Sequence, residues 1–165
     1  MQAAIKNHKS HLAPITTTST TIMAFDHKGR TALYMACSCG ATEIALKLIK
    51  GGSNCNAQDQ DQCTPLFVAA TNGYSNCVHL LLRAGAFLDL PDSNGITPLM
   101  AAAREGHLQC TKALVESGAS QVAVDFHLKR SAYSWVHRTS LLFPTCTHCT
   151  PERIYFWSLI RRFLA

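Results

Sequence analysis

The chain has 165 residues and a formal net charge of +5, which suits one domain of ordinary size with extensions. The positive charge lies toward the ends, because residues 26–125 carry seven Lys or Arg and nine Asp or Glu, whereas residues 126–165 carry six basic residues and one Glu. A nucleic-acid-binding domain would show a basic stripe on its folded part, so this balance argues against that class.

Residues 1–25 are rich in Ser and Thr and contain no acidic residue. They lack the continuous apolar run of a signal peptide, and they contain no Arg, which transit peptides favour. We predict a disordered leader over 1–25. The cysteines that follow show no repeated pairing, so we expect reduced thiols and a cytoplasmic protein, with the nucleus as the alternative.

The middle of the chain repeats at a fixed step. Thr31, Thr64 and Thr97 are equally spaced and define this step. The other positions that keep it are Asp26, Asp59, Asp92 and Asp125; Ala36, Ala69 and Ala102; Gly40, Gly73 and Gly106; Leu48, Leu81 and Leu114; Gly52, Gly85 and Gly118. A period of this length over three segments marks a repeat architecture. We place the units at 26–58, 59–91 and 92–125.

Each unit reads as two short helices. In the third unit, Thr97 before Pro98 predicts a capped helix start, because the Thr hydroxyl accepts from a first-turn amide and Pro gives up a donor that has no partner. Gly106 ends that helix, residues 107–108 turn the chain, and a second helix ends at Gly118. One unit buries too little apolar surface to fold alone, so the units must stack.

Between units, short turns form tips. Asn94-Gly95 is predicted to form the tip of a β-turn, and the repeated Asp at each turn entry is predicted to be a turn-capping side chain. Cys37 takes the column of Ala70 and Ala103, which predicts a buried small residue.

These features resemble the ankyrin repeat family. The matching stretches are "DHKGRTALYMACSCGATEIALKLIKGGSNCNA", "DQDQCTPLFVAATNGYSNCVHLLLRAGAFLDL" and "DSNGITPLMAAAREGHLQCTKALVESGASQVA". The resemblance implies an all-α solenoid of helix-turn-helix repeats joined by β-turn tips. The chain departs from the family's pattern at three places. Gln62 stands where the second unit would have a turn glycine, and Ala32 stands where the first unit would have Pro. The family's His after Thr-Pro-Leu is replaced in every unit. That last column holds Tyr34, Phe67 and Met100, which we expect to pack between repeats.

The resemblance also implies a non-enzymatic adaptor or scaffold that binds a protein partner through the concave face of the stack. Partner contacts would come from the tips and from the exposed end of each first helix. At the tips these are His27, Lys28 and Arg30; Gln60, Asp61 and Cys63; and Ser93, Asn94 and Ile96. At the helix ends they are Ser38 and Cys39, Thr71 and Asn72, and Arg104 and Glu105.

Residues 126–165 are predicted to be a non-repeat basic and aromatic tail, partly disordered, because the fixed step fails after Asp125. Three interpretations remain open. Part of the tail packs on the third unit as a cap; or residues 154–165 form an amphipathic membrane-surface helix, too short to span a bilayer; or the tail is the truncated or alternatively spliced end of a longer repeat protein.

The sequence holds no catalytic constellation, so we predict no catalytic residues and no cofactor. Cys146 and Cys149 form a CxxC, but zinc needs four ligands. Upstream only His137 and His127 are available, apart from His148 within the motif itself, so we predict unpaired thiols and treat a weak metal site as the alternative.

Overall fold

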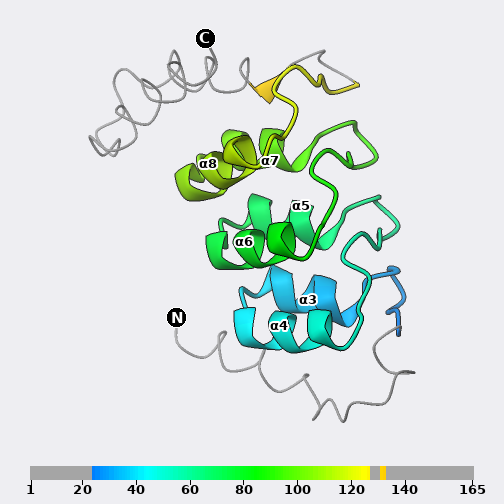
Figure 1. The fold of residues 1–165 in the computed structure, drawn as a ribbon. Coiled ribbons are helices and arrows are strands. Elements are labelled where there is room, and N and C mark those ends of the chain that lie inside the picture. The colour runs from blue at the N-terminus through cyan, green and yellow to red at the C-terminus, as the bar shows by residue number, and fades with distance from the viewer. Residues whose placement is uncertain (1–23, 127–130, 133–165) are drawn as a thin grey trace, which may run out of the picture.

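The computed structural model describes residues 24–126 and 131–132, and it shows three helix pairs stacked in chain order with the connecting tips on one side (Figure 1). The first helices of the pairs, which we call inner, are α3 (Ala32–Ser38), α5 (Pro65–Thr71) and α7 (Pro98–Glu105). The second helices, which we call outer, are α4 (Thr42–Lys50), α6 (Ser75–Arg83) and α8 (Leu108–Glu116). This arrangement confirms the predicted all-α stack of helix pairs.

The inner helices begin at the predicted threonines. The hydroxyl oxygens of Thr31 and Thr64 each accept a hydrogen bond of 3.1 Å from the backbone amide three residues on, and Thr97 accepts one of 3.4 Å in the same way. Pro65 and Pro98 occupy the first helical position. The caps satisfy amides that have no partner inside the helix, which explains why the same short signal starts all three.

The ends of the helices follow the glycines with one difference. Gly106 closes α7 in the left-handed conformation with φ of 78°. The next helix already begins at Leu108, so the turn is one residue shorter than the predicted 107–108. Outer helix α8 ends at Glu116, and Gly118 follows it with φ of 91°.

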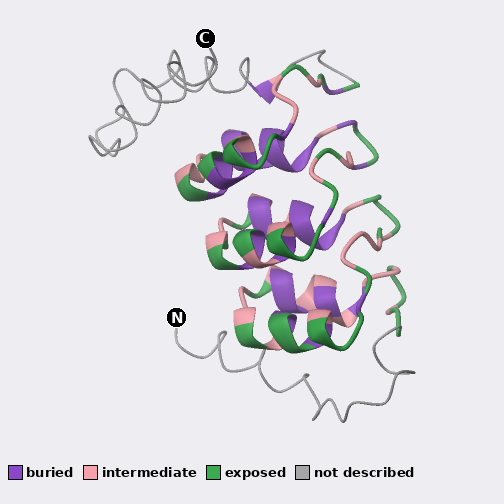
Figure 2. Ribbon diagram, viewed as in Figure 1, coloured by how far each residue is buried: buried purple, intermediate pink, exposed green. Residues whose placement is uncertain are grey.

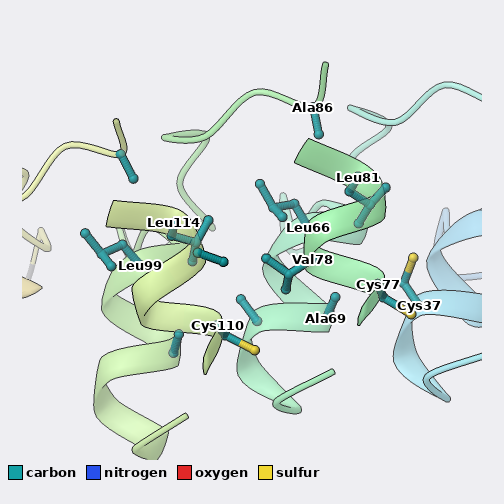
Figure 3. Packing of buried hydrophobic residues seen from close by; sticks show 14 of the residues in the cluster. Cys37, Leu66, Ala69, Cys77, Val78, Leu81, Ala86, Leu99, Cys110 and Leu114 are labelled. Carbon is teal, nitrogen blue, oxygen red and sulfur yellow. The ribbon is translucent and has the colours of Figure 1, made fainter. Parts of the chain in front are cut away.

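The core runs through all three units rather than through any single one. Leu33, Leu66 and Leu99 on the inner helices are at most 1% exposed. The outer helices contribute the column Leu48, Leu81 and Leu114 to the same core. Figure 3 shows two of these residues, Leu81 and Leu114, close to Leu66 and Leu99 of the inner helices. Inner helices pack on inner helices and outer on outer, so each unit depends on its neighbour for burial. Burial is therefore greatest between the helices and least at the tips and outer surfaces (Figure 2).

Two predictions about buried columns are confirmed. Cys37 is fully buried, as are Ala70 and Ala103 in the same column. Phe67 and Met100 are buried and Tyr34 is half-buried, as expected of side chains that pack between repeats. All six cysteines in the described part of the chain are free thiols.

Aromatic rings pack against the turns between the two helices of a unit. A Cβ added at Gly40 would lie 2.6 Å from the ring of Tyr74, and one added at Gly73 would lie 2.6 Å from the ring of His107. The His107 Nε2 atom is also 2.9 Å from the carbonyl oxygen of Thr71. Each ring comes from the next unit, so this side of the stack is joined by side-chain packing on glycine.

Residues 1–23 of the predicted leader 1–25 and most of the tail fall outside the described residues. The predicted membrane-surface segment 154–165 and the Cys146–Cys149 motif are among them. Within 24–126 and 131–132, no helix is long and apolar enough to cross a membrane. The same ranges contain no group of three or more His, Cys, Asp or Glu arranged to hold a metal ion.

Candidate functional site: the tip face

One aspartate builds each tip. Asp26 Oδ1 accepts hydrogen bonds from the backbone amides two and four residues later, both at 2.9 Å. Asp59 makes the same pair of bonds at 3.0 and 2.8 Å, and Asp92 makes them at 2.9 and 2.8 Å. The predicted turn-capping role of these carboxylates is confirmed. The same pair of aspartate bonds thus fixes the backbone of each tip.

Backbone hydrogen bonds join each tip to the next. The amide of Gln60 donates to the carbonyl of Lys28 at 3.0 Å, and the amide of Ser93 donates to the carbonyl of Asp61 at 2.9 Å. Donor and acceptor both advance by one repeat between the two bonds. Because only backbone atoms take part, the side chains at these positions remain free to differ from unit to unit.

Sequence reasoning missed a second set of bonds between units. Asn56 Oδ1 accepts from the backbone amide of Phe87, and Asp89 Oδ1 accepts from that of Ser120, each at 2.8 Å. The two acceptors are spaced by the same step as the repeated threonines, which is the signal that could have revealed them. It was hidden because one acceptor is an amide and the other a carboxylate.

The second tip carries backbone strain. Gln62 has φ of 61°, whereas Gly29 and Gly95 take the equivalent left-handed conformation at 74° and 80°. A side chain in this region costs about 1–2 kcal/mol relative to glycine. The tip keeps its shape despite Gln62 because Asp59 and the bonds to the first tip hold it.

We call the tips and the C-terminal ends of α3, α5 and α7 the tip face. The tips precede the inner helices, whereas the helix ends lie beside the interhelical turns. The predicted partner-binding residues all lie on these elements, and they divide by exposure. The exposed ones are His27, Lys28, Gln60, Asp61, Ser93 and Asn94 at the tips, and Cys39, Asn72 and Glu105 at the helix ends. The half-buried ones are Arg30, Cys63, Ile96, Ser38, Thr71 and Arg104. The exposed set is the part of the face that a partner can reach without rearrangement.

Several of these side chains are already engaged within the chain. Gln60 Nε2 donates to the carbonyl of His27 at 3.0 Å, and Asn72 Nδ2 donates to the carbonyl of Ser38 at 3.2 Å. Arg104 Nε lies 2.9 Å from a Glu105 carboxylate oxygen. These bonds stiffen the face and lower its capacity to form new contacts at those atoms.

The first tip contains an ion pair. Arg30 Nε donates to Asp26 Oδ2 at 2.8 Å, and its terminal nitrogen lies 2.6 Å from the same oxygen. The side-chain hydrogen bond from Arg30 holds the pKa of Asp26 well below its ordinary value, helped by the backbone amides of Arg30 and Lys28. Arg30 is therefore part of the tip's own framework.

The second tip is negative. Asp61 is exposed, and burial together with the nearby Asp59 carboxylate raises the pKa of the Cys63 thiol to about 12. The thiol stays protonated at neutral pH and points its hydrogen toward the carbonyl of Asp61, with 3.8 Å between sulfur and oxygen. The exposed charge of this tip thus comes from carboxylates alone.

Comparison with known families settles the kind of repeat. A family model described as ankyrin repeats in three copies matches residues 42–125, which is just over half of the chain. The chain belongs to the ankyrin repeat family. The match begins at the first residue of α4, and the structure shows that α3 completes the first ankyrin pair. Ankyrin repeats are generally protein–protein interaction modules without enzymatic activity. No curated protein matches the chain.

Proposed function

We propose that this ankyrin protein is an adaptor or scaffold that binds a protein partner through its tip face. The observation that supports the proposal is the ladder of backbone hydrogen bonds from Lys28 to Gln60 and from Asp61 to Ser93. It holds chemically different tips in one row at fixed spacing. A partner that binds such a row does not have to order it first, so less binding energy is lost on association.

The exposed charges suggest how the partner is oriented. Lys28 gives the first tip an exposed ammonium group, and Asp61 gives the second an exposed carboxylate. The third tip offers the uncharged polar side chains of Ser93 and Asn94. A complementary protein surface would place a carboxylate opposite the first tip and a basic group opposite the second, and such charge patterns fix register and speed association.

This chemistry also selects the residues to change in a test. Arg30 and Arg104 are poor choices, because their guanidinium groups are paired with Asp26 and Glu105 and their loss would disturb the face itself. Lys28 and Asp61 are better, since within the described residues their side chains make no hydrogen bond or ion pair.

The test is affinity capture with the full chain, followed by measurement of Kd for the captured protein. We expect Lys28→Glu and Asp61→Lys each to weaken binding about tenfold or more, as loss of a complementary charge contact does. The matched control for Lys28→Glu is Lys47→Glu, which makes the same charge change at an exposed position of outer helix α4. Equal binding by all three variants, or a loss with Lys47→Glu alone, would assign the partner to another face.

A further inference from the structure

Two buried thiols meet where the first unit packs on the second. Cys37 lies on inner helix α3, Cys77 lies on outer helix α6, and both are fully buried. A hydrogen bond joins the two thiols, and Figure 3 shows their side chains next to each other at the boundary between the units. The hydroxyl oxygen of Thr42, which also belongs to the first unit, lies 3.5 Å from the Cys77 sulfur. Cys77 is therefore packed against the first unit by both of these side chains.

The repeat provides an internal comparison for this pair. Cys110 occupies the place of Cys77 in the third unit, because each is the third residue of its outer helix and each is fully buried. The place of Cys37 is taken in the second unit by Ala70. The boundary between the second and third units therefore has a methyl group where the first boundary has a second thiol.

The hydrogen bond makes the two thiols of the pair chemically different. It lowers the pKa of the Cys77 thiol below its ordinary value, against the effect of burial and with help from Thr42. The same bond, together with burial, raises the pKa of the Cys37 thiol. At Cys110, burial raises the pKa to about 11. Because the thiolate is the nucleophile in thiol chemistry, Cys77 is the attacking sulfur of the pair and Cys37 is the thiol that completes the bond.

We propose that Cys37 and Cys77 are a modification site, at which a peroxide converts the two thiols into a reversible disulfide that links the first ankyrin unit to the second. A disulfide requires an S–S distance of about 2.0 Å, and thiols already in hydrogen-bond contact need only a short approach to reach it. Both thiols are buried, so the peroxide reaches them when the packing between the two units opens briefly. The inference does not depend on the proposed partner binding.

The reaction uses one peroxide for each pair of thiols. The Cys77 thiolate attacks one oxygen of hydrogen peroxide, the O–O bond breaks, and the departing hydroxide takes up the proton that the Cys77 thiol released. The Cys37 sulfur then attacks the sulfur of the resulting sulfenic acid, and its own proton leaves with the hydroxyl group as a second water. Two thiols are thereby oxidised to one disulfide, and the peroxide is reduced to two waters.

Peptide mapping of the full chain tests the proposal. Exposed thiols such as Cys39 are first blocked on the folded protein with N-ethylmaleimide, and the protein is then treated with hydrogen peroxide. Digestion with chymotrypsin, which cuts after Phe67 and Tyr74, separates Cys77 from the cysteines that precede it. We expect a peptide pair linked through Cys37 and Cys77 that disappears on reduction with dithiothreitol.

Two matched variants connect this bond to the stability of the stack. In the blocked wild type, the oxidised protein should unfold at a urea concentration about 1 M higher than the reduced protein, because the disulfide restricts the unfolded chain. Cys37→Ala should abolish both the linked peptides and this gain, and it introduces the residue that Ala70 and Ala103 already provide at the equivalent places. Cys110→Ala removes a different buried thiol and should leave both unchanged.

Three results would overturn the proposal. The first is recovery of Cys37 and Cys77 as free thiols under conditions in which peroxide oxidises Cys39 of an unblocked sample. The second is a linkage of Cys77 to Cys110, or of Cys37 to Cys55, as often as the proposed one, which would show that the pairing does not follow the packing of the first boundary. The third is a lower urea midpoint after oxidation, which would show that the stack does not accommodate the bond. If a variant fails to fold, the map of the wild-type protein decides alone.

Discussion

The two sides of the stack are joined in different ways. On the side of the interhelical turns, the ring of Tyr74 or His107 packs directly on a glycine of the preceding unit. On the tip side, the units are joined by hydrogen bonds between backbone atoms, as from Gln60 to Lys28. The turn side therefore restricts which side chains are tolerated, whereas the tip side holds its geometry while its side chains vary. A surface of the second kind suits recognition.

The glycines make this difference measurable. Gly73 and Gly85 have nearly the same left-handed φ, 78° and 80°. A Cβ at Gly73 would lie 2.6 Å from His107, but a Cβ at Gly85, after an outer helix, would meet nothing within 4 Å.

We expect the largest effect from Gly73→Ala. It should lower the free energy of unfolding by about 2–4 kcal/mol, which combines about 1–2 kcal/mol for the left-handed backbone with overpacking against the ring. Gly85→Ala should show the backbone component alone, about 1–2 kcal/mol. Urea denaturation of the full chain measures both.

A double-mutant cycle separates the two components of the Gly73 effect. His107→Ala should remove most of the extra loss in Gly73→Ala, so the two changes together should cost less than their sum. Equal losses in Gly73→Ala and Gly85→Ala would mean that the ring moves aside freely, and the turn side would then be no more restrictive than the tip side.

A smaller effect, of opposite sign, is expected on the tip side. Gln62→Gly should raise the free energy of unfolding by roughly 0.5–1 kcal/mol, because relief of the left-handed strain at φ of 61° exceeds the added chain entropy of glycine. Gln62→Ala keeps the strain and serves as the control. A loss of stability in Gln62→Gly would show that the Gln62 side chain itself supports the tip, against the view that backbone bonds suffice.

The contrast also explains what the sequence could predict. The helix caps at Thr31, Thr64 and Thr97 and the leucine columns follow local rules of spacing, so they were predicted correctly. The bonds from Asn56 and Asp89 were not, because each joins residues 31 positions apart and the acceptors differ in chemical type. The ring contacts were not predicted either, because Tyr74 and His107 occupy equivalent positions in the repeat but are different residue types.

For the tip face, the sequence identified the positions but not whether each side chain is exposed or paired within the chain. Exposure of Lys28 and Asp61 follows from how the tips stack, which no single tip specifies. The pairing of Arg30 with Asp26 depends on the turn closing so that residues four apart meet outside a helix. The bond from the Phe126 amide to the Asn94 carbonyl was not predicted, because no Gly, Thr or Pro follows Asp125 at the repeated spacing.

The smallest predicted effect concerns pH and the first tip. The pKa of Asp26 is held below its ordinary value by Arg30, so the folded state binds this proton less readily than the unfolded chain does. The resulting stabilisation is complete above the unfolded pKa of about 3.9 and is lost as the pH falls from there toward the folded pKa. Wild type and Arg30→Gln should therefore differ in urea midpoint at pH 6 and converge in acid.

An NMR titration of the Asp26 carboxyl provides the direct measurement, and in Arg30→Gln its pKa should move back toward the ordinary value. The backbone bonds from Lys28 and residue 30 to Oδ1 remain in that variant, so the shift should be partial. An unchanged pKa would mean that the backbone amides alone lower it and that the ion pair with Arg30 makes no contribution. A partial return would instead show that the first tip adds an ion pair to the common backbone framework, which leaves Lys28, and not Arg30, as the exposed cation of that tip.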